Sequence, residues 1–215
     1  MRVSVVGIGY VGLVTAAGIA HLGHDVVCID TDKDKVDAVN RGVSPICEAG
    51  LDDLLGYCVL RSGRLKAYVQ YEPVSDTDLT MICVGTPSNS DWSIDLSPIS
   101  DAAKRIGESL HGKTGYHAVV TRSTIIPGTT RDLTIPLLER HSGKKAGVDL
   151  GIAYNPEFLQ EGKAVNAFFK PDRIIIGELD ETAGNILAEI YHNIPAPIFK
   201  TDVTTAEMTK YASNA

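Results

Sequence analysis

Three glycines near the start of the chain have the spacing of a turn that binds phosphate. Gly7, Gly9 and Gly12 follow the apolar run at 3–6 and open the helical pattern at 11–22. In a GxGxxG turn, the first glycine permits the tight bend, the second lets backbone approach a pyrophosphate, and the third lets the helix pack against the strand. The helix N-terminus adds N–H donors and a partial positive charge. The pattern therefore predicts a dinucleotide-binding site.

An acidic residue further along narrows the choice of dinucleotide. The second apolar run, 25–29, ends at Asp30, close to the spacing of ~20 residues at which such turns place an acid on the ribose. A carboxylate accepts hydrogen bonds from both ribose hydroxyls but repels a 2′-phosphate, so NAD is favoured over NADP. Lys35 lies one turn into the next helical pattern, where it either reaches the same ribose or is a solvated surface lysine. A flavin or a nucleotide sugar held by the same glycines is the alternative to NAD.

Three polar segments follow apolar runs in the rest of the chain, at 84–88, 122–129 and 155–162. In open α/β sheets, ligands bind at the carboxyl ends of parallel strands. We therefore expect the three segments and the glycine turn to converge on one crevice. Within the second segment, the Thr124 hydroxyl either holds a water or a ribose or belongs to an ordinary turn or helix cap.

Two pairs of residues have the i, i+4 spacing of a helical face. Glu157 and Glu161 share a face if a helix begins at Pro156, and paired carboxylates carry out acid–base chemistry when burial shifts a pKa. The alternative is an acid near a helix N-terminus and a solvent-facing glutamate. Lys210 and Asn214 would project from one face of the last helix and could stabilise an alkoxide or oxyanion. A solvated helix face is the alternative for this second pair.

The elements that position these residues alternate along the chain. Apolar runs rich in Val and Ile predict strands at 3–6, 25–29, 79–84, 118–121, 150–154 and 173–177. Amphipathic segments predict helices at 11–22, 33–41, 50–61, 98–110, 128–140 and 181–193, with loops at 85–93, 141–149 and 168–173. The alternation predicts an α/β fold, a Rossmann-type doubly wound sheet that is mainly parallel. A final helix is expected from Asp202, with Thr204 or Thr205 near its N-cap.

Composition limits the classes of partner. The net charge of the 215-residue chain is −7, without the basic cluster of a nucleic-acid binder. The sequence contains no run of 18 apolar residues, so no membrane span is predicted. A first strand from about Arg2 leaves no room for a signal peptide. These features predict a cytoplasmic protein. The four cysteines show no CxxC spacing, so neither a metal site nor a disulfide is expected.

Six ordered motifs carry a resemblance to a known family: VVGIGYVGL, SPICEAGLDDLL, ICVGTPS, RSTIIPGT, NPEFLQEG and AEMTKYASNA. Together they are similar to the N-terminal half of the UDP-glucose/GDP-mannose dehydrogenases. The stretches SGKKAGVDLG, IGELD and APIF look most like the GDP-mannose branch, with UDP-glucose as the rival substrate.

The resemblance implies a reaction and a role for each motif residue. Such enzymes of polysaccharide biosynthesis act as homodimers and use two NAD⁺ to oxidise the sugar C6 alcohol to a carboxylate, through an aldehyde and a cysteine thioester. The implied cofactor-binding residues are Gly7, Gly9, Tyr10, Val11, Gly12, Asp30, Lys35, Thr86 and Thr124. The implied catalytic residues are Thr124, Glu161, Lys210 and Asn214, and the implied substrate-binding residues are Glu157, Glu161, Lys210 and Asn214.

One departure from the family limits the expected activity. The nucleophilic cysteine of the family lies in a GGxC segment that none of Cys28, Cys47, Cys58 and Cys83 matches. The resemblance covers only the N-terminal half of a family member, so we expect residues 1–201 to form the NAD-binding domain. Residues 202–215 would begin a connecting helix to a missing dimerisation and substrate domain, so the truncated chain would not complete the oxidation. A non-catalytic dinucleotide-binding module and a shorter β-hydroxyacid dehydrogenase are alternatives, which the intact acid, lysine and amide positions and the six-motif order disfavour.

Overall fold

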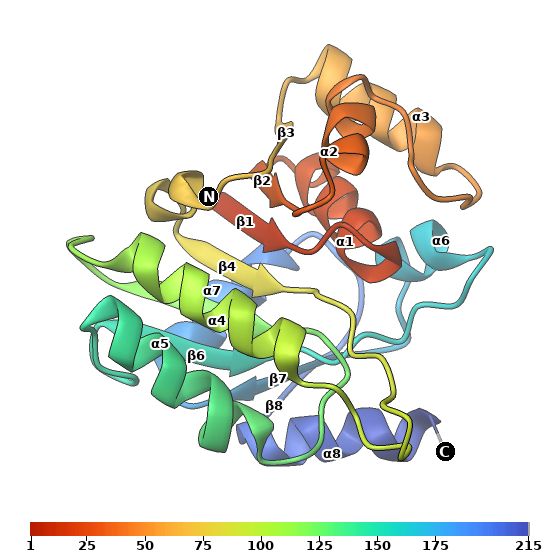
Figure 1. Ribbon diagram of the computed structural model, residues 1–215. Helices are drawn as coiled ribbons and strands as arrows, with labels where there is room; N and C mark the ends of the chain where they lie inside the picture. The colour runs from red at the N-terminus through yellow and green to blue at the C-terminus, as the bar shows by residue number, and fades with distance from the viewer. Residues whose placement is uncertain (215) are drawn as a thin grey trace.

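One sheet organises the part of the chain that the computed structural model describes, residues 1–214. Within it, eight strands lie in the order β3-β2-β1-β4-β5-β6-β7-β8 (Figure 1). The strands are β1 (Arg2–Val6), β2 (Asp25–Ile29), β3 (Leu65–Tyr68), β4 (Leu79–Ile82), β5 (His117–Thr121), β6 (Leu150–Tyr154), β7 (Ile174–Glu178) and β8 (Ile198–Thr201). The first six strands in this order, β3 to β6, all run parallel to one another. The predicted Rossmann-type α/β fold is therefore confirmed.

Helices cover both faces of this sheet (Figure 1). The helices are α1 (Tyr10–His21), α2 (Lys33–Asn40), α3 (Leu51–Gly56), α4 (Ser97–Leu110), α5 (Ile135–Ser142), α6 (Ala164–Phe169), α7 (Glu181–Ile190) and α8 (Val203–Asn214). Short turns of other helix types are η1 (Tyr57–Arg61), η2 (Glu72–Asp76) and η3 (Thr130–Thr134). Buried side chains of α1, α2, α3, α6 and α7 form the core on one face, and those of α4, α5 and α8 pack on the other.

The structure departs from the predicted elements in a few places. β7 runs antiparallel to β6, with Tyr154 opposite Gly177. The sequence did not predict this, because a buried apolar run predicts a strand without fixing its direction. The four-residue strands β3 and β8 were not predicted; β3 alternates in burial, and β8 is largely exposed at the sheet edge. The helices expected at 50–61 and 128–140 are each divided by a π-helical turn. The expected loop at 168–173 begins inside α6.

Two acidic side chains fasten the last helix. A threonine was expected near the start of α8, but the side chain that accepts hydrogen bonds there is that of Asp202. It accepts from Thr205 N at 2.9 Å and from the Thr205 hydroxyl at 2.5 Å. Glu207 is fully buried and accepts from Gly128 N at 2.5 Å and Thr130 N at 2.9 Å. The first turns of α8 therefore belong to the packed core. Among the described helices, none combines the length and apolar character needed to cross a bilayer.

A buried histidine sits at the amino end of the sheet. His117 Nε2 lies 2.8 Å from Thr80 Oγ1, and its Nδ1 lies 2.8 Å from Thr77 O and 3.1 Å from Lys113 Nζ. Burial, followed by the positive charge of Lys113, lowers the pKa of His117 from 6.5 to about 3. The folded protein therefore holds this imidazole neutral at pH values where the unfolded chain protonates it.

We expect His117 to make the fold sensitive to acid. Below pH 6.5 the unfolded chain binds a proton at this residue, whereas the folded chain resists protonation until about pH 3. The free energy of unfolding should therefore fall as the pH drops through this window, by about 3 kcal/mol between pH 7 and pH 4. Urea unfolding of wild type and His117→Gln at both pH values measures the effect, since glutamine does not titrate. An equal loss of stability in the two proteins would contradict this origin.

Candidate active site

The glycine turn has the geometry that its sequence predicts. Gly7 has a φ of +90°, and a Cβ there would lie 2.9 Å from the Cys83 carbonyl. A Cβ on Gly12 would lie 1.8 Å from Gly7 O, so the helix and the turn touch without room for a side chain. Gly9 begins α1 as its N-cap with no side-chain cap, and a Cβ there would meet nothing within 4 Å. The first-turn N–H groups therefore face open space suited to a pyrophosphate.

Asp30 lies at the end of β2, directly against this turn. Its Oδ2 accepts from Ile8 N at 2.8 Å and its Oδ1 from Asp32 N at 2.9 Å. An ionised carboxylate has about four acceptor positions, so both oxygens keep capacity for ribose hydroxyls. Lys35 is half-exposed, and its Nζ is 3.9 Å from Asp32. Its side chain is thus near the ribose-binding region, paired with a carboxylate other than that of Asp30.

Hydrogen bonds join the loops that follow β4, β5 and β6. Thr86 donates its hydroxyl to Thr124 O at 2.8 Å, which brings together two of the predicted cofactor residues. Ser123 donates to Val84 O at 2.6 Å, and Tyr154 donates to Ser123 O at 3.1 Å. Since β4, β5 and β6 are parallel, the three polar segments lie at one sheet edge, and their convergence with the glycine turn on one crevice stays a prediction.

A buried ion pair joins α8 to the loop after β6. Lys210 Nζ donates to Glu157 O at 2.6 Å and to Glu157 Oε1 at 2.7 Å. The two side chains are only 5% and 11% exposed. The solvated helix face considered for Lys210 is therefore wrong. Sequence spacing could not reveal the pairing, because the partners are 53 residues apart.

The helix that the pairing of Glu157 and Glu161 would require does not form. Residues 155–160 are irregular, a turn follows at 161–163, and α6 begins only at Ala164. Glu157 Oε2 accepts from Leu159 N at 2.7 Å, a local bond that competes with helix formation. Glu157 and Glu161 consequently do not share a helical face: Glu157 is buried, whereas Glu161 is exposed. Asn214 is the last residue of α8, and its side chain lies outside the described part of the chain.

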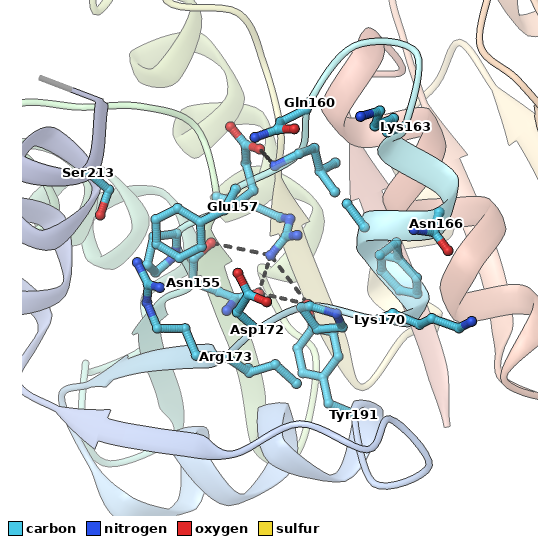
Figure 2. Close-up of a pocket in the computed structure, with 18 residues that line it drawn as sticks. Asn155, Glu157, Gln160, Lys163, Asn166, Lys170, Asp172, Arg173, Tyr191 and Ser213 are labelled. Carbon is cyan, nitrogen blue, oxygen red and sulfur yellow. Dashed lines mark hydrogen bonds between the residues drawn. The ribbon is translucent and has the colours of Figure 1, made fainter.

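A buried guanidinium supports the Glu157 loop from below. Arg122 Nε donates to Thr15 Oγ1 at 3.2 Å, and its NH1 donates to Asn155 Oδ1 and, at 3.3 Å, to the Tyr191 hydroxyl. Tyr191 in turn donates to Asn155 Oδ1 at 2.7 Å. This network borders a pocket of about 380 Å³ between the 155–160 loop, α6 and residues 170–174. Figure 2 shows Glu157 and Gln160 on one side of the pocket and Tyr191 on the other.

Glu48 is a site residue to which the sequence analysis gave no role. It is 7% exposed, and its carboxylate accepts from the Tyr10 hydroxyl at 2.5 Å, Gly162 N at 2.7 Å and Ala164 N at 2.8 Å. The SPICEAG segment that contains it stood out as a motif, but its partners lie 38 to 116 residues away. The signal in the sequence that could have indicated this role was an acidic residue in a loop segment with no cationic residue beside it.

Comparison with known proteins identifies the family. Residues 1–195 match the NAD binding domain of the UDP-glucose/GDP-mannose dehydrogenase family. The chain belongs to this dehydrogenase family. It is 45% identical over 215 residues to a GDP-mannose 6-dehydrogenase of Pseudomonas syringae pv. tomato, covering 100% of this chain and 49% of the relative. It is also 45% identical over 220 residues to a UDP-glucose 6-dehydrogenase of Haloferax volcanii, covering 100% of this chain and 51% of the relative.

Solved structures agree with this membership in the dehydrogenase family. A ternary complex of GDP-mannose dehydrogenase from Pseudomonas aeruginosa superposes with a TM-score of 0.97 at 44% identity, covering 100% of this chain and 49% of that one. A UDP-glucose dehydrogenase from Pyrobaculum islandicum gives 0.94 at 43% identity, covering 99% and 49%. The chain therefore spans about half the length of the relatives it matches. As the NAD binding domain of this dehydrogenase family, it binds NAD, which confirms the prediction from the glycine turn.

The cysteines of this dehydrogenase domain are poorly placed for nucleophilic chemistry. Cys28, Cys58 and Cys83 are buried, and only Cys47 is exposed. Burial raises the pKa of Cys58 to about 11 and that of Cys83 to about 12, and it raises the pKa of Cys28 as well. Since the thiolate is the reactive form, these three thiols are inert near neutral pH.

Proposed function

We propose that the chain is the NAD-binding half of an enzyme that oxidises the C6 hydroxyl of GDP-mannose to the carboxylate of GDP-mannuronate with two NAD⁺. The observation that carries this proposal is the buried Lys210–Glu157 pair at the sheet edge that also holds the glycine turn. An ammonium has three donors, and Glu157 accepts two of those of Lys210. The third remains for an oxygen of the sugar.

Each residue has a proposed part in this chemistry. NAD⁺ supplies the hydride acceptor, held by the glycine turn, Tyr10, Val11, Asp30, Lys35, Thr86 and Thr124. Lys210, with Asn214, binds the sugar and stabilises negative charge that develops on its C6 oxygen. Glu157 fixes the position of the Lys210 ammonium, while the exposed Glu161 and Thr124 orient the water that hydrolyses the thioester.

The proposal extends to the protein that would contain this domain. Residues 1–201 form the NAD-binding domain and α8 begins the connection to a substrate and dimerisation domain, in a cytoplasmic homodimer of polysaccharide biosynthesis. Because three of the four cysteines are buried and none lies in the GGxC segment of the family, the 215 residues alone would bind NAD⁺ without completing the oxidation.

The test compares the 215-residue chain with a protein that carries it at the full length of its relatives. With GDP-mannose, the longer protein should form two NADH per sugar, and the chain alone should form no uronate. Turnover of GDP-mannose to the uronate by the chain alone would overturn its proposed incompetence. UDP-glucose is the second candidate substrate because a relative that is named for it is equally similar, at 45% identity. A preference for UDP-glucose by the longer protein would overturn the choice of GDP-mannose.

We expect Asp30 to determine the choice between NAD⁺ and NADP⁺. In Asp30→Ala, the ribose hydroxyls lose their acceptor and Ile8 N loses its partner, so the affinity for NAD⁺ should fall about tenfold or more. Binding of NADP⁺ should fall less or improve, because the repulsion of its 2′-phosphate is removed. Calorimetric titration of the 215-residue chain with both dinucleotides measures these changes. Tighter binding of NADP⁺ than NAD⁺ by wild type would contradict the role of Asp30.

A further inference from the structure

Glu48 lies where two functional segments meet. It belongs to the loop before α3, yet its carboxylate is buried between the start of α1 and the turn that precedes α6. Oε2 accepts from the Tyr10 hydroxyl and Gly162 N, and Oε1 accepts from Ala164 N. No cation pairs with it among the described residues. Three hydrogen bonds from two distant segments therefore satisfy this carboxylate.

The first of these segments is the beginning of the cofactor-binding helix. Tyr10 immediately follows Gly9, the N-cap of α1, where the N–H groups face the space suited to the pyrophosphate. Burial, followed by the hydrogen bond to Glu48, raises the pKa of Tyr10, so its hydroxyl remains a donor. Any restraint that the pyrophosphate places on the first turn of α1 reaches Glu48 through this hydroxyl.

The second segment carries Glu161. Glu48 accepts from the amide of Gly162, the next residue, and Gln160 O, on the other side of Glu161, lies 3.0 Å from the Tyr10 hydroxyl oxygen. Gly162 has a φ of +80°, a left-handed conformation that glycine adopts without strain. The backbone on both sides of Glu161 is thus held by the Tyr10–Glu48 pair.

We propose that Glu48 is a positioning residue that couples NAD⁺ binding at the glycine turn to the placement of Glu161. With the cofactor bound, α1 holds Tyr10, Tyr10 holds Glu48, and Glu48 fixes the amides at 162 and 164. The proposal rests on the proposed role of Glu161 in the reaction. The coupling itself is measured without turnover, so its failure is distinguishable from failure of the dehydrogenase proposal.

Hydrogen exchange of the 215-residue chain at saturating NAD⁺ tests the coupling. In wild type, NAD⁺ should slow exchange of the Gly162 and Ala164 amides by about tenfold. In Glu48→Gln, whose amide nitrogen cannot accept, the slowing should fall to about twofold or less while NAD⁺ still binds in calorimetry. Equal slowing in this variant, or no slowing in wild type, would overturn the proposal.

Two further variants separate coupling from loop integrity. Tyr10→Phe removes only the hydroxyl and should lose the NAD⁺-dependent slowing of exchange, as Glu48→Gln does. This variant therefore tests the coupling even if Glu48→Gln does not fold. Asp52→Asn is the matched control, because Asp52 caps Ser44 N at 2.8 Å in the same region and is not among the partners of Tyr10. It should keep the slowing. Its loss in this control would show that the integrity of the loop, not Glu48, is responsible.

Discussion

Replacing Gly12 by alanine should push α1 away from the glycine turn and abolish measurable NAD⁺ binding. The added Cβ would stand 1.8 Å from Gly7 O and 3.0 Å from Cys83 Cβ, and both neighbours directly follow central strands, β1 and β4. Overpacking of this kind costs about 1–3 kcal/mol, or more where backbone must move. We expect the free energy of unfolding to fall by at least that amount. Urea unfolding and calorimetric titration with NAD⁺ measure the two effects.

Gly9→Ala is the matched comparison for Gly12→Ala. A Cβ at Gly9 meets no atom of the protein within 4 Å, so the stability of this variant should stay within about 1 kcal/mol of wild type. Binding of NAD⁺ should still weaken, because the methyl group occupies the space through which backbone approaches the pyrophosphate. Unchanged NAD⁺ affinity in Gly9→Ala would place the pyrophosphate elsewhere.

Replacing Lys210 by methionine should strongly destabilise the fold. The side chain is 5% exposed, and its removal leaves the Glu157 carboxylate and the Glu157 carbonyl without their donor. Breaking a buried pair from one side costs about 3–5 kcal/mol. The double variant Lys210→Met/Glu157→Gln should recover part of the loss, because no charge is then left unpaired.

A surface pair provides the control for this prediction. Lys33 pairs with Asp37 on α2, where the side chains are 75% and 43% exposed. Lys33→Met should therefore change the free energy of unfolding very little. Comparable losses in the two methionine variants, measured by urea unfolding at neutral pH, would show that burial of Lys210 does not matter.

The parts of the site that local sequence determines were predicted well. Gly12 and Asp30 make their close contacts within one βαβ unit, Gly12 against Gly7 O and Asp30 with Ile8 N, whereas Gly7 packs against Cys83 after β4. The main strands and the mainly parallel sheet were predicted from alternating apolar runs and helical segments, since a parallel sheet needs helices on both faces. The exposed edge strand β8 has no such pattern and was missed.

The parts that depend on distant partners were not predictable from spacing. Glu157 and Glu161 have the spacing of a helix, but the segment that carries them is irregular, and Glu157 accepts hydrogen bonds there from Leu159 N and Lys210 Nζ. The same spacing rule placed Lys210 on a helix correctly without indicating that it is buried. Glu48 shows the limit most clearly, because its role exists only through contacts with residues 38 and 116 positions away.

The contact of Tyr10 with Gln160 also bears on the order of events during synthesis. It joins residues 150 positions apart, and Glu48 closes a second loop of 116 residues to Ala164. Tyr10 and Glu48 can pair once residue 48 has been synthesised, but their contacts with residues 160–164 must wait until the chain has grown beyond Ala164. Such non-local closures are slow steps of folding. In a nascent chain, the contacts that join the start of α1 to the turn before α6 therefore form late, after β6 has been synthesised.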